Sequence, residues 1–138
     1  MTTFNTDKWL SLITDSDEVD KKKAALNALS MMKNTITVRT VEVVWQCFIS
    51  ETDSTVKGAA ILCLGAMVAK LNDDQRSFFQ EELRTILKNR DDAEDNLRAD
   101  AYNCILVILC KNEIDEDFER SLFSCLSGYN KDPLNLFG

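Results

Sequence analysis

Two apolar patterns recur along this chain of 138 residues at nearly the same interval. The first is an apolar triplet at positions i, i+3 and i+4, which forms one face of a helix. The second is a basic residue, then alanine three residues later, then an aliphatic residue four further on. Two patterns that both repeat near 39 residues predict an internal repeat of paired helices, because such repeats have periods of about 40 residues. The triplets are Trp9/Leu12/Ile13, Val44/Cys47/Phe48, Leu83/Ile86/Leu87 and Leu122/Cys125/Leu126, and the second pattern occurs at Lys22/Ala25/Leu29, Lys57/Ala60/Leu64 and Arg98/Ala101/Ile105.

The stretch 53–67 predicts the most buried helix of this set. Either Asp53 or Ser54 can cap its first turn by accepting a hydrogen bond from a free backbone N–H. Apolar residues then form one helical stripe that runs on to Leu71, and further apolar residues lie beside that stripe. A helix that is apolar on several sides is covered by several neighbours. We therefore expect a central helix over about 54–71.

Seven helices are expected in all, because glycine (4) and proline (1) are scarce and the apolar spacing is helical almost throughout. The run 38–44 is rich in β-branched residues and also fits a strand, but its triplet spacing favours a helix. Residues 1–128 form one predicted domain, which ends at a glycine stop, Gly128. The tail 129–138 is expected to dock on the last helix, to act as a short peptide ligand, or to be disordered. The expected helices cover about 7–13, 19–33, 38–49, 54–71, 74–87, a segment from the loop 89–95 to about 110, and 115–128.

The central stretch resembles the second helix of a HEAT repeat. That helix commonly reads Asp, Val-Arg, Ala-Ala and Ala-Leu-Gly, and here Asp53, Val56-Lys57, Ala59-Ala60 and Leu64-Gly65-Ala66 match it. The later copy departs from the pattern at Asp100, where alanine is usual, and the usual proline of the first helix is missing throughout. The resemblance covers about residues 6–128. It implies an all-α fold: a short α-solenoid of three HEAT-like helix pairs plus a terminal helix.

The charge of the chain is unevenly distributed. Residues 1–50 carry six acidic and six basic residues, so the whole net charge of −7 falls on residues 51–138. This argues against general binding of nucleic acid, which needs basic residues to displace phosphate counterions. It suits a basic protein partner or simply solubility.

The basic residues of the second pattern are expected to pair with acids of the preceding turns. A row that binds phosphate or acidic groups is the alternative. The pairs would be Lys22 with Asp17, Lys57 with Asp53 and Arg98 with Asp95.

The sequence contains few of the residues that catalysis requires. It has no histidine, which excludes a Ser-His-Asp or Cys-His arrangement and a histidine-ligated metal, and it has no glycine-rich phosphate loop. We therefore expect no catalytic residue, no metal site and no cofactor. No signal peptide or membrane-spanning stretch is apparent. Five cysteines without a C-x-x-C motif fit reduced core thiols in a cytoplasmic protein; they are Cys47, Cys63, Cys104, Cys110 and Cys125.

These features predict a non-enzymatic protein–protein interaction module: a compact acidic adaptor, or an inhibitor or immunity-type binder of a basic protein such as a toxin or a nucleic-acid-handling enzyme. The chain would be a monomer or a weak oligomer. The alternatives are a HEAT-like nucleic-acid-processing enzyme and a structural assembly subunit. In HEAT-like stacks the second helices usually line the concave, partner-binding face. Tyr102 is the strongest single candidate there because aromatic residues dominate binding hot spots, and burial of Tyr102 in the core is the alternative. The resemblance implies that the exposed positions on that face are Lys23, Asn27, Ile61, Arg98, Tyr102 and Asn103.

Overall fold

The computed structural model describes residues 6–32, 36–89, 91, 94–111 and 114–130. Within these ranges the chain is all-α, with seven α-helices, one short 3-10 helix and no strand, which confirms the predicted all-α class and its seven helices. None of the described helices is both long and apolar enough to cross a membrane. The helices are α1 (Thr6–Asp15), α2 (Val19–Met31), α3 (Val38–Ser50), α4 (Ser54–Ala66), the 3-10 helix η2 (Val68–Lys70), α5 (Asp73–Lys88), α6 (Asp95–Lys111) and α7 (Glu116–Asn130).

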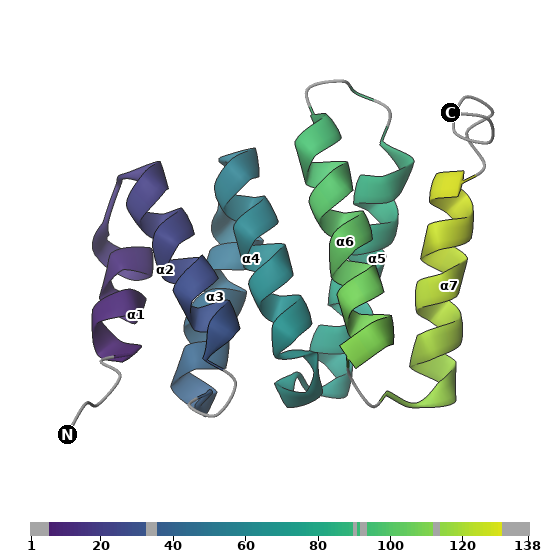
Figure 1. Cartoon of the computed structure of the whole chain (residues 1–138), viewed down its shortest axis with the longest axis horizontal. Helices are drawn as coiled ribbons and strands as arrows, with labels where there is room; N and C mark the ends of the chain where they lie inside the picture. Colours follow the sequence, from purple (N-terminus) through teal and green to yellow (C-terminus); the bar gives the residue numbers. More distant parts are fainter. Residues whose placement is uncertain (1–5, 33–35, 90, 92–93, 112–113, 131–138) are drawn as a thin grey trace.

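The helices pack in two layers (Figure 1). Helices α2, α4 and α6 lie side by side and run in the same direction, so their N-terminal ends share one edge of the molecule. The other layer consists of odd-numbered helices, among which α1 packs on α3 and α5 packs on α7. Helix α4 lies between α2 and α6 and makes its most extensive contacts with these two. The open side of α2, α4 and α6 is called the even-helix face below.

Helix α4 begins at the predicted cap. One carboxylate oxygen of Asp53 accepts hydrogen bonds from the backbone N–H groups of Thr55 (2.9 Å) and Val56 (3.2 Å). The hydroxyl of Thr55 donates to the same oxygen, and with these backbone donors it lowers the pKa of Asp53. The predicted end at Leu71 is wrong, because α4 stops at Ala66 and the 3-10 helix η2 follows. Leu71 is nevertheless buried, so apolar spacing alone could not locate this break.

The other helix limits mix confirmed and wrong predictions. Helix α3 forms where a strand was the alternative, and Asn72 makes a capping box with Gln75 at the start of α5. Asp115 caps α7 by accepting the N–H of Phe118 at 2.8 Å. The glycine stop at Gly128 is wrong, because α7 continues through that residue to Asn130. The predicted docking of the tail concerns residues 131–138, which lie outside the described residues.

Two glycines bring α4 and α6 into close contact. A Cβ atom on Gly58 would lie 2.0 Å from Oδ2 of Asp100, and one on Gly65 would lie 2.6 Å from Sγ of Cys104. Both separations are far below van der Waals contact, so each glycine makes room for a side chain of α6. The thiol of Cys104 also donates a hydrogen bond to the Ile61 carbonyl across this contact (3.4 Å). The α4–α6 contact, defined by these residues, is called the glycine seam below.

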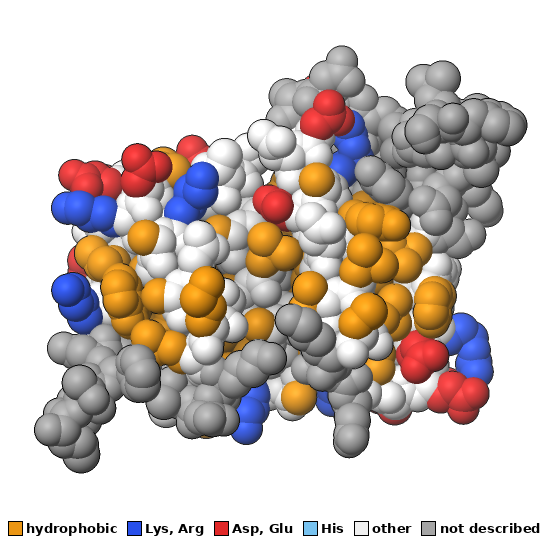
Figure 2. Space-filling model, in the orientation of Figure 1, with side chains coloured by type: hydrophobic (Ala, Val, Ile, Leu, Met, Phe, Trp, Pro, Cys, Tyr) orange, Lys and Arg blue, Asp and Glu red, His pale blue; other side chains and the backbone are white. Residues whose placement is uncertain are grey.

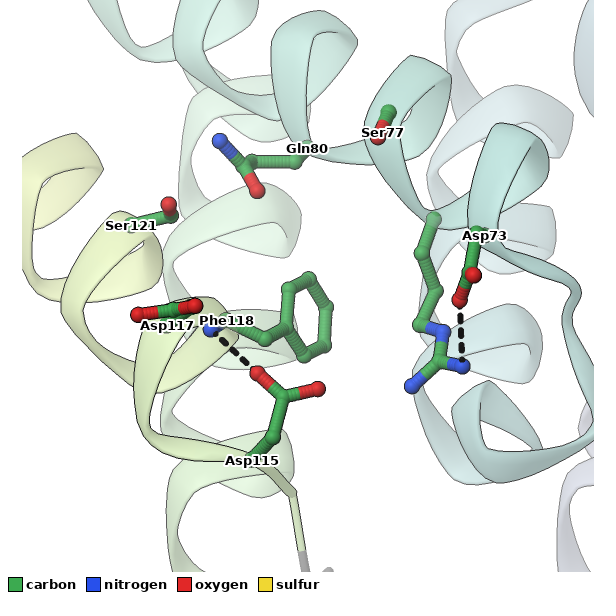
Figure 3. A pocket seen from close by; sticks show the side chains of 8 residues that line it. Asp73, Ser77, Gln80, Asp115, Asp117, Phe118 and Ser121 are labelled. Carbon is green, nitrogen blue, oxygen red and sulfur yellow. Dashed lines mark hydrogen bonds and ion pairs between the residues drawn. The ribbon is translucent and has the colours of Figure 1, made fainter.

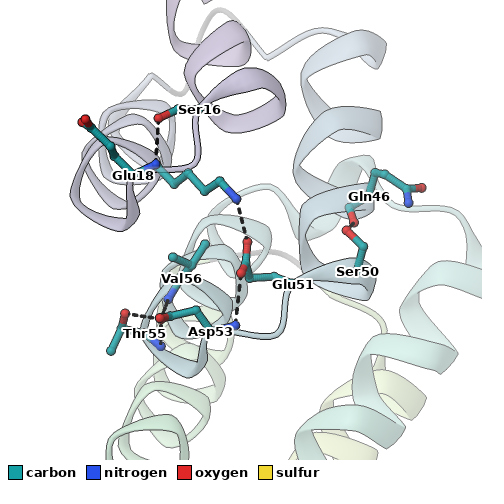
Figure 4. A network of polar contacts seen from close by, with 9 residues as sticks. Ser16, Glu18, Gln46, Ser50, Glu51, Asp53, Thr55 and Val56 are labelled. Atoms are coloured by element: carbon teal, nitrogen blue, oxygen red, sulfur yellow. Dashed lines mark hydrogen bonds and ion pairs between the residues drawn. The ribbon is translucent and has the colours of Figure 1, made fainter.

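Most of the predicted charge pairs form with other partners. Lys22 binds Glu51 at 3.2 Å rather than Asp17, and the second oxygen of Glu51 accepts the N–H of Asp53 at 3.1 Å (Figure 4). Lys57 pairs with Glu82 of α5 at 3.6 Å rather than with Asp53. Lys22 therefore joins α2 to the pair α3 and α4, and Lys57 joins α4 to the pair α5 and α6. The third prediction is confirmed, because Arg98 pairs with Asp95.

Candidate functional site

A groove of about 330 Å³ crosses the even-helix face and touches all three of its helices. Figure 2 shows this face, where hydrophobic side chains spread over the middle and charged side chains gather mostly toward the edges. Helix α2 contributes a lysine and an asparagine, α4 a mainly apolar floor, and α6 an asparagine and a carboxylate. The lining residues are Lys23, Asn27, Thr55, Ala59, Leu62, Asn96, Ala99 and Asp100.

The groove holds one half-buried carboxylate, Asp100. Its side chain lies against the backbone of α4 at Gly58, where no Cβ is present to exclude it. Burial raises the pKa of Asp100, while the positive charge of Lys23 on the α2 side partly lowers it. The groove therefore presents a negative charge on α6 that is incompletely balanced, and a positive charge on α2.

No protein family model, curated protein or solved structure matches the chain.

The structure brings two of the six predicted binding residues together. Lys23 and Asn27, which the resemblance to HEAT repeats placed on the open face, line the groove. Asn103 is exposed and Tyr102 half-buried on α6, but neither lines the groove. Whether these four residues bind a partner stays a prediction.

Ile61 is not an exposed residue, and that part of the prediction is wrong. Its side chain is 0% exposed and belongs to the hydrophobic core. Neighbouring residues on a helix point about 100° apart, so two successive apolar residues rarely face the same side. Leu62, the next residue, lines the groove instead.

Arg98 is also buried, with 8% of its surface exposed, so its predicted exposure is wrong. Its guanidinium pairs with Asp95 and donates hydrogen bonds to the backbone carbonyls of Asn89 and Asp91. The carbonyls belong to the segment that precedes α6, so Arg98 holds the α5–α6 connection against the start of α6.

Sequence reasoning missed Asp100, the charged residue on the α6 side of the groove. A signal for it was present, because Asp100 occupies a position where the HEAT pattern usually has alanine. A carboxylate at a helix-packing position needs a small residue opposite, and that residue is Gly58, 42 positions earlier in the chain. The pairing of these two positions is a tertiary contact that spacing within one helix does not reveal.

A second hollow of about 340 Å³ lies between α5 and α7 (Figure 3). Arg76 forms an ion pair with Asp73 at 3.1 Å, and its guanidinium lies 5.9 Å from the centre of the Phe118 ring. Asp115 is engaged in capping α7, so three charged residues of this hollow serve local contacts. The hollow spans only two neighbouring helices, and we therefore place the candidate site at the groove of the even-helix face. The hollow is lined by Asp73, Arg76, Ser77, Gln80, Asp115, Asp117, Phe118 and Ser121.

The buried cysteines are weak nucleophiles. Burial raises the pKa of Cys47 to about 11 and that of Cys63 to about 12, and it also raises the pKa values of Cys104 and Cys125. These four thiols are therefore protonated near neutral pH and lack the reactive thiolate form. Cys110 is exposed, contrary to the expected core position. Within the described ranges, no group of three or more His, Cys, Asp or Glu residues is placed to hold a metal ion.

Proposed function

We propose that this chain is a non-enzymatic protein-binding module, a short α-solenoid of HEAT-like helix pairs that binds a protein partner across its even-helix face. The observation that carries this proposal is the groove, because it spans three successive helices of one layer. A site made by residues from 23 to 100 in the chain needs α2, α4 and α6 packed side by side. The two layers and the recurring sequence patterns support the HEAT-like assignment.

The surface around the groove favours binding of a protein over catalysis. Its floor is apolar, through Ala59 and Leu62, and polar side chains from all three helices surround that floor. Protein-binding surfaces commonly combine an apolar centre with a polar rim. The protonated thiols and the lack of histidine agree with a binding role.

We propose a basic partner, because the chain carries a net charge of −7. The excess of acidic residues falls on residues 51–138, which include α4 and α6 of the even-helix face. An acidic surface speeds association with a basic protein and weakens its binding as salt is added. An inhibitor or adaptor for a basic protein fits these features. A cytoplasmic location is part of the proposal, because the described cysteines are free thiols.

The test compares two arginine substitutions in the tagged full-length protein. Ala99→Arg places a bulky cation in the groove, whereas Gln46→Arg adds the same charge at an exposed position on α3. The same protein should co-purify with the wild type and with Gln46→Arg but not with Ala99→Arg. Retention by Ala99→Arg would reject the even-helix face as the binding surface. An affinity for that protein that is unchanged from low to high salt would reject the basic partner.

An aromatic cluster favours a second candidate, a structural subunit that associates through its odd helices. The rings of Trp45 and Phe78 lie 5.7 Å apart between α3 and α5, and 48% of Phe78 is exposed. Ile49 of α3 is also exposed. Light scattering would reveal concentration-dependent assembly, and Phe78→Ser should abolish it if this cluster mediates the contact.

A further inference from the structure

Asp100 occupies an unusual place for a carboxylate. It lies on α6 with Oδ2 directly over Gly58 of α4. The space between them is too small for even one methyl group on residue 58. The same residue lines the groove of the even-helix face, so its carboxyl group stands between the helix seam and the opening. A buried position alone would favour an uncharged residue there.

The carboxylate of Asp100 lacks a close charged partner in the part of the chain that the structure describes. Among the described residues, no Lys or Arg nitrogen lies within the 4 Å of an ion pair, and the side chain of Asp100 makes no hydrogen bond to another described residue. Lys23 acts on it only over a longer range. A half-buried carboxylate without a close partner carries a desolvation cost that a cation brought by another molecule would offset.

The rest of the groove fits the side chain that such a cation would come from. Ala59, Leu62 and Ala99 offer apolar contact to an aliphatic stem, and lysine and arginine commonly bury their stems while the charged end stays polar. Thr55 and Asn96 lie in the same lining and offer oxygen acceptors to a guanidinium or ammonium group. Lys23 stands on the α2 side, where it favours a carbonyl or carboxylate of the bound segment.

We infer that Asp100 binds a lysine or arginine side chain of a basic protein segment that lies across the even-helix face. This inference rests on the proposed function and adds the residue that gives it specificity. The occupant is a protein segment. The single carboxylate and the negative charge of the chain match a basic side chain, and the apolar floor matches the aliphatic stem and backbone of such a segment. Asp100 is thus a specificity-determining residue, and Gly58 is the residue that makes room for it.

The experiment selects binders from a library of random peptides displayed on phage, with the folded full-length chain as bait. Peptides selected by the wild type should share a lysine or arginine. They should bind Asp100→Asn on the order of tenfold more weakly or worse, because an ion pair in a groove is lost. Glu119→Gln is the matched control, since it removes one negative charge from an exposed position on α7, and it should bind as the wild type does. Thermal unfolding verifies that each variant is folded.

A double-mutant cycle identifies the pair directly. Replacing the basic residue of a selected peptide by glutamine should weaken binding to the wild type and have little further effect on Asp100→Asn. Peptides that lose affinity for Ala99→Arg but bind Asp100→Asn as tightly as the wild type would overturn this inference and leave the proposed function standing. A selection that yields no peptide sensitive to Ala99→Arg would overturn both.

Discussion

Two aspartates of the even-helix layer meet opposite environments. At the start of α4, Asp53 accepts two backbone N–H groups and a hydroxyl, and its pKa is lowered. In the groove, Asp100 has its carboxylate against helix α4, and burial raises its pKa. The first region satisfies its charge locally and so serves the fold. The second leaves its charge incompletely balanced, which is the condition under which a ligand gains most by binding.

Leu64→Asp should have the largest effect, and it tests whether the fold tolerates a half-buried or buried carboxylate only beside a groove. Leu64 of α4 is fully buried, and an aspartate there would have no groove and no partner. Leu64→Asp should unfold the chain, because an unpaired buried charge costs several kcal/mol out of a total stability of about 5–15 kcal/mol. Circular dichroism would report the loss of helix. Leu64→Met, which keeps the volume, should remain folded, and a folded Leu64→Asp would contradict the comparison.

The glycine seam should give the next largest effect. A Cβ on Gly65 meets the buried Cys104, and such overpacking costs about 1–3 kcal/mol, reduced by the roughly 1 kcal/mol that alanine gains over glycine in a helix. Gly58→Ala should cost less, because the Asp100 carboxylate can turn away into the groove. Urea unfolding measures both. Cys104→Ala should partly rescue Gly65→Ala, and a Gly58→Ala variant less stable than Gly65→Ala would contradict this order.

The cap at Asp53 should have a smaller effect that depends on pH. Asp53→Ala removes the acceptor of three hydrogen bonds and should lower the melting temperature at neutral pH. Because the pKa of Asp53 is lowered in the folded chain, its contribution is complete above the ordinary value of 3.8 and is lost as the pH falls through the folded value. Melting curves of wild type and variant should therefore converge in acid. A gap that widens below pH 3.8 would argue against this cap.

Asp100→Asn should give the smallest effect and the opposite sign. The pKa of Asp100 is raised in the folded chain, so its contribution to stability is greatest below 3.8 and declines as the pH rises through the folded value. At neutral pH the variant should melt slightly above the wild type, and the difference should close in acid. A variant that melts below the wild type at neutral pH would mean that the carboxylate is balanced within the protein.

The sequence predicted the helices well because burial in a two-layer stack produces a regular apolar spacing. The end of α4 at Ala66 and the continuation of α7 through Gly128 were missed, since the burial of Leu71 does not depend on the type of helical turn and a glycine does not always end a helix. The ends of both helices depend on how the neighbouring segments pack. The spacing of residues within one helix carries no information about that packing.

The candidate site was predicted only in part, for a related reason. The resemblance to HEAT repeats placed Lys23 and Asn27 on the open face of the stack, and both line the groove. Arg98 was misplaced because the carbonyls that it binds belong to another segment, and Asp100 was missed because its place depends on Gly58. Contacts between distant parts of the chain therefore set the site more than they set the helices.

Because Gly58 carries a hydrogen atom where other residues carry a Cβ, the Asp100 carboxylate can lie against α4, and the composition of the groove depends on this one position. Replacing that hydrogen by a methyl group would displace the Asp100 side chain and change both the shape and the polarity of the groove. Engineered variants that differ at this single position should therefore present different binding surfaces.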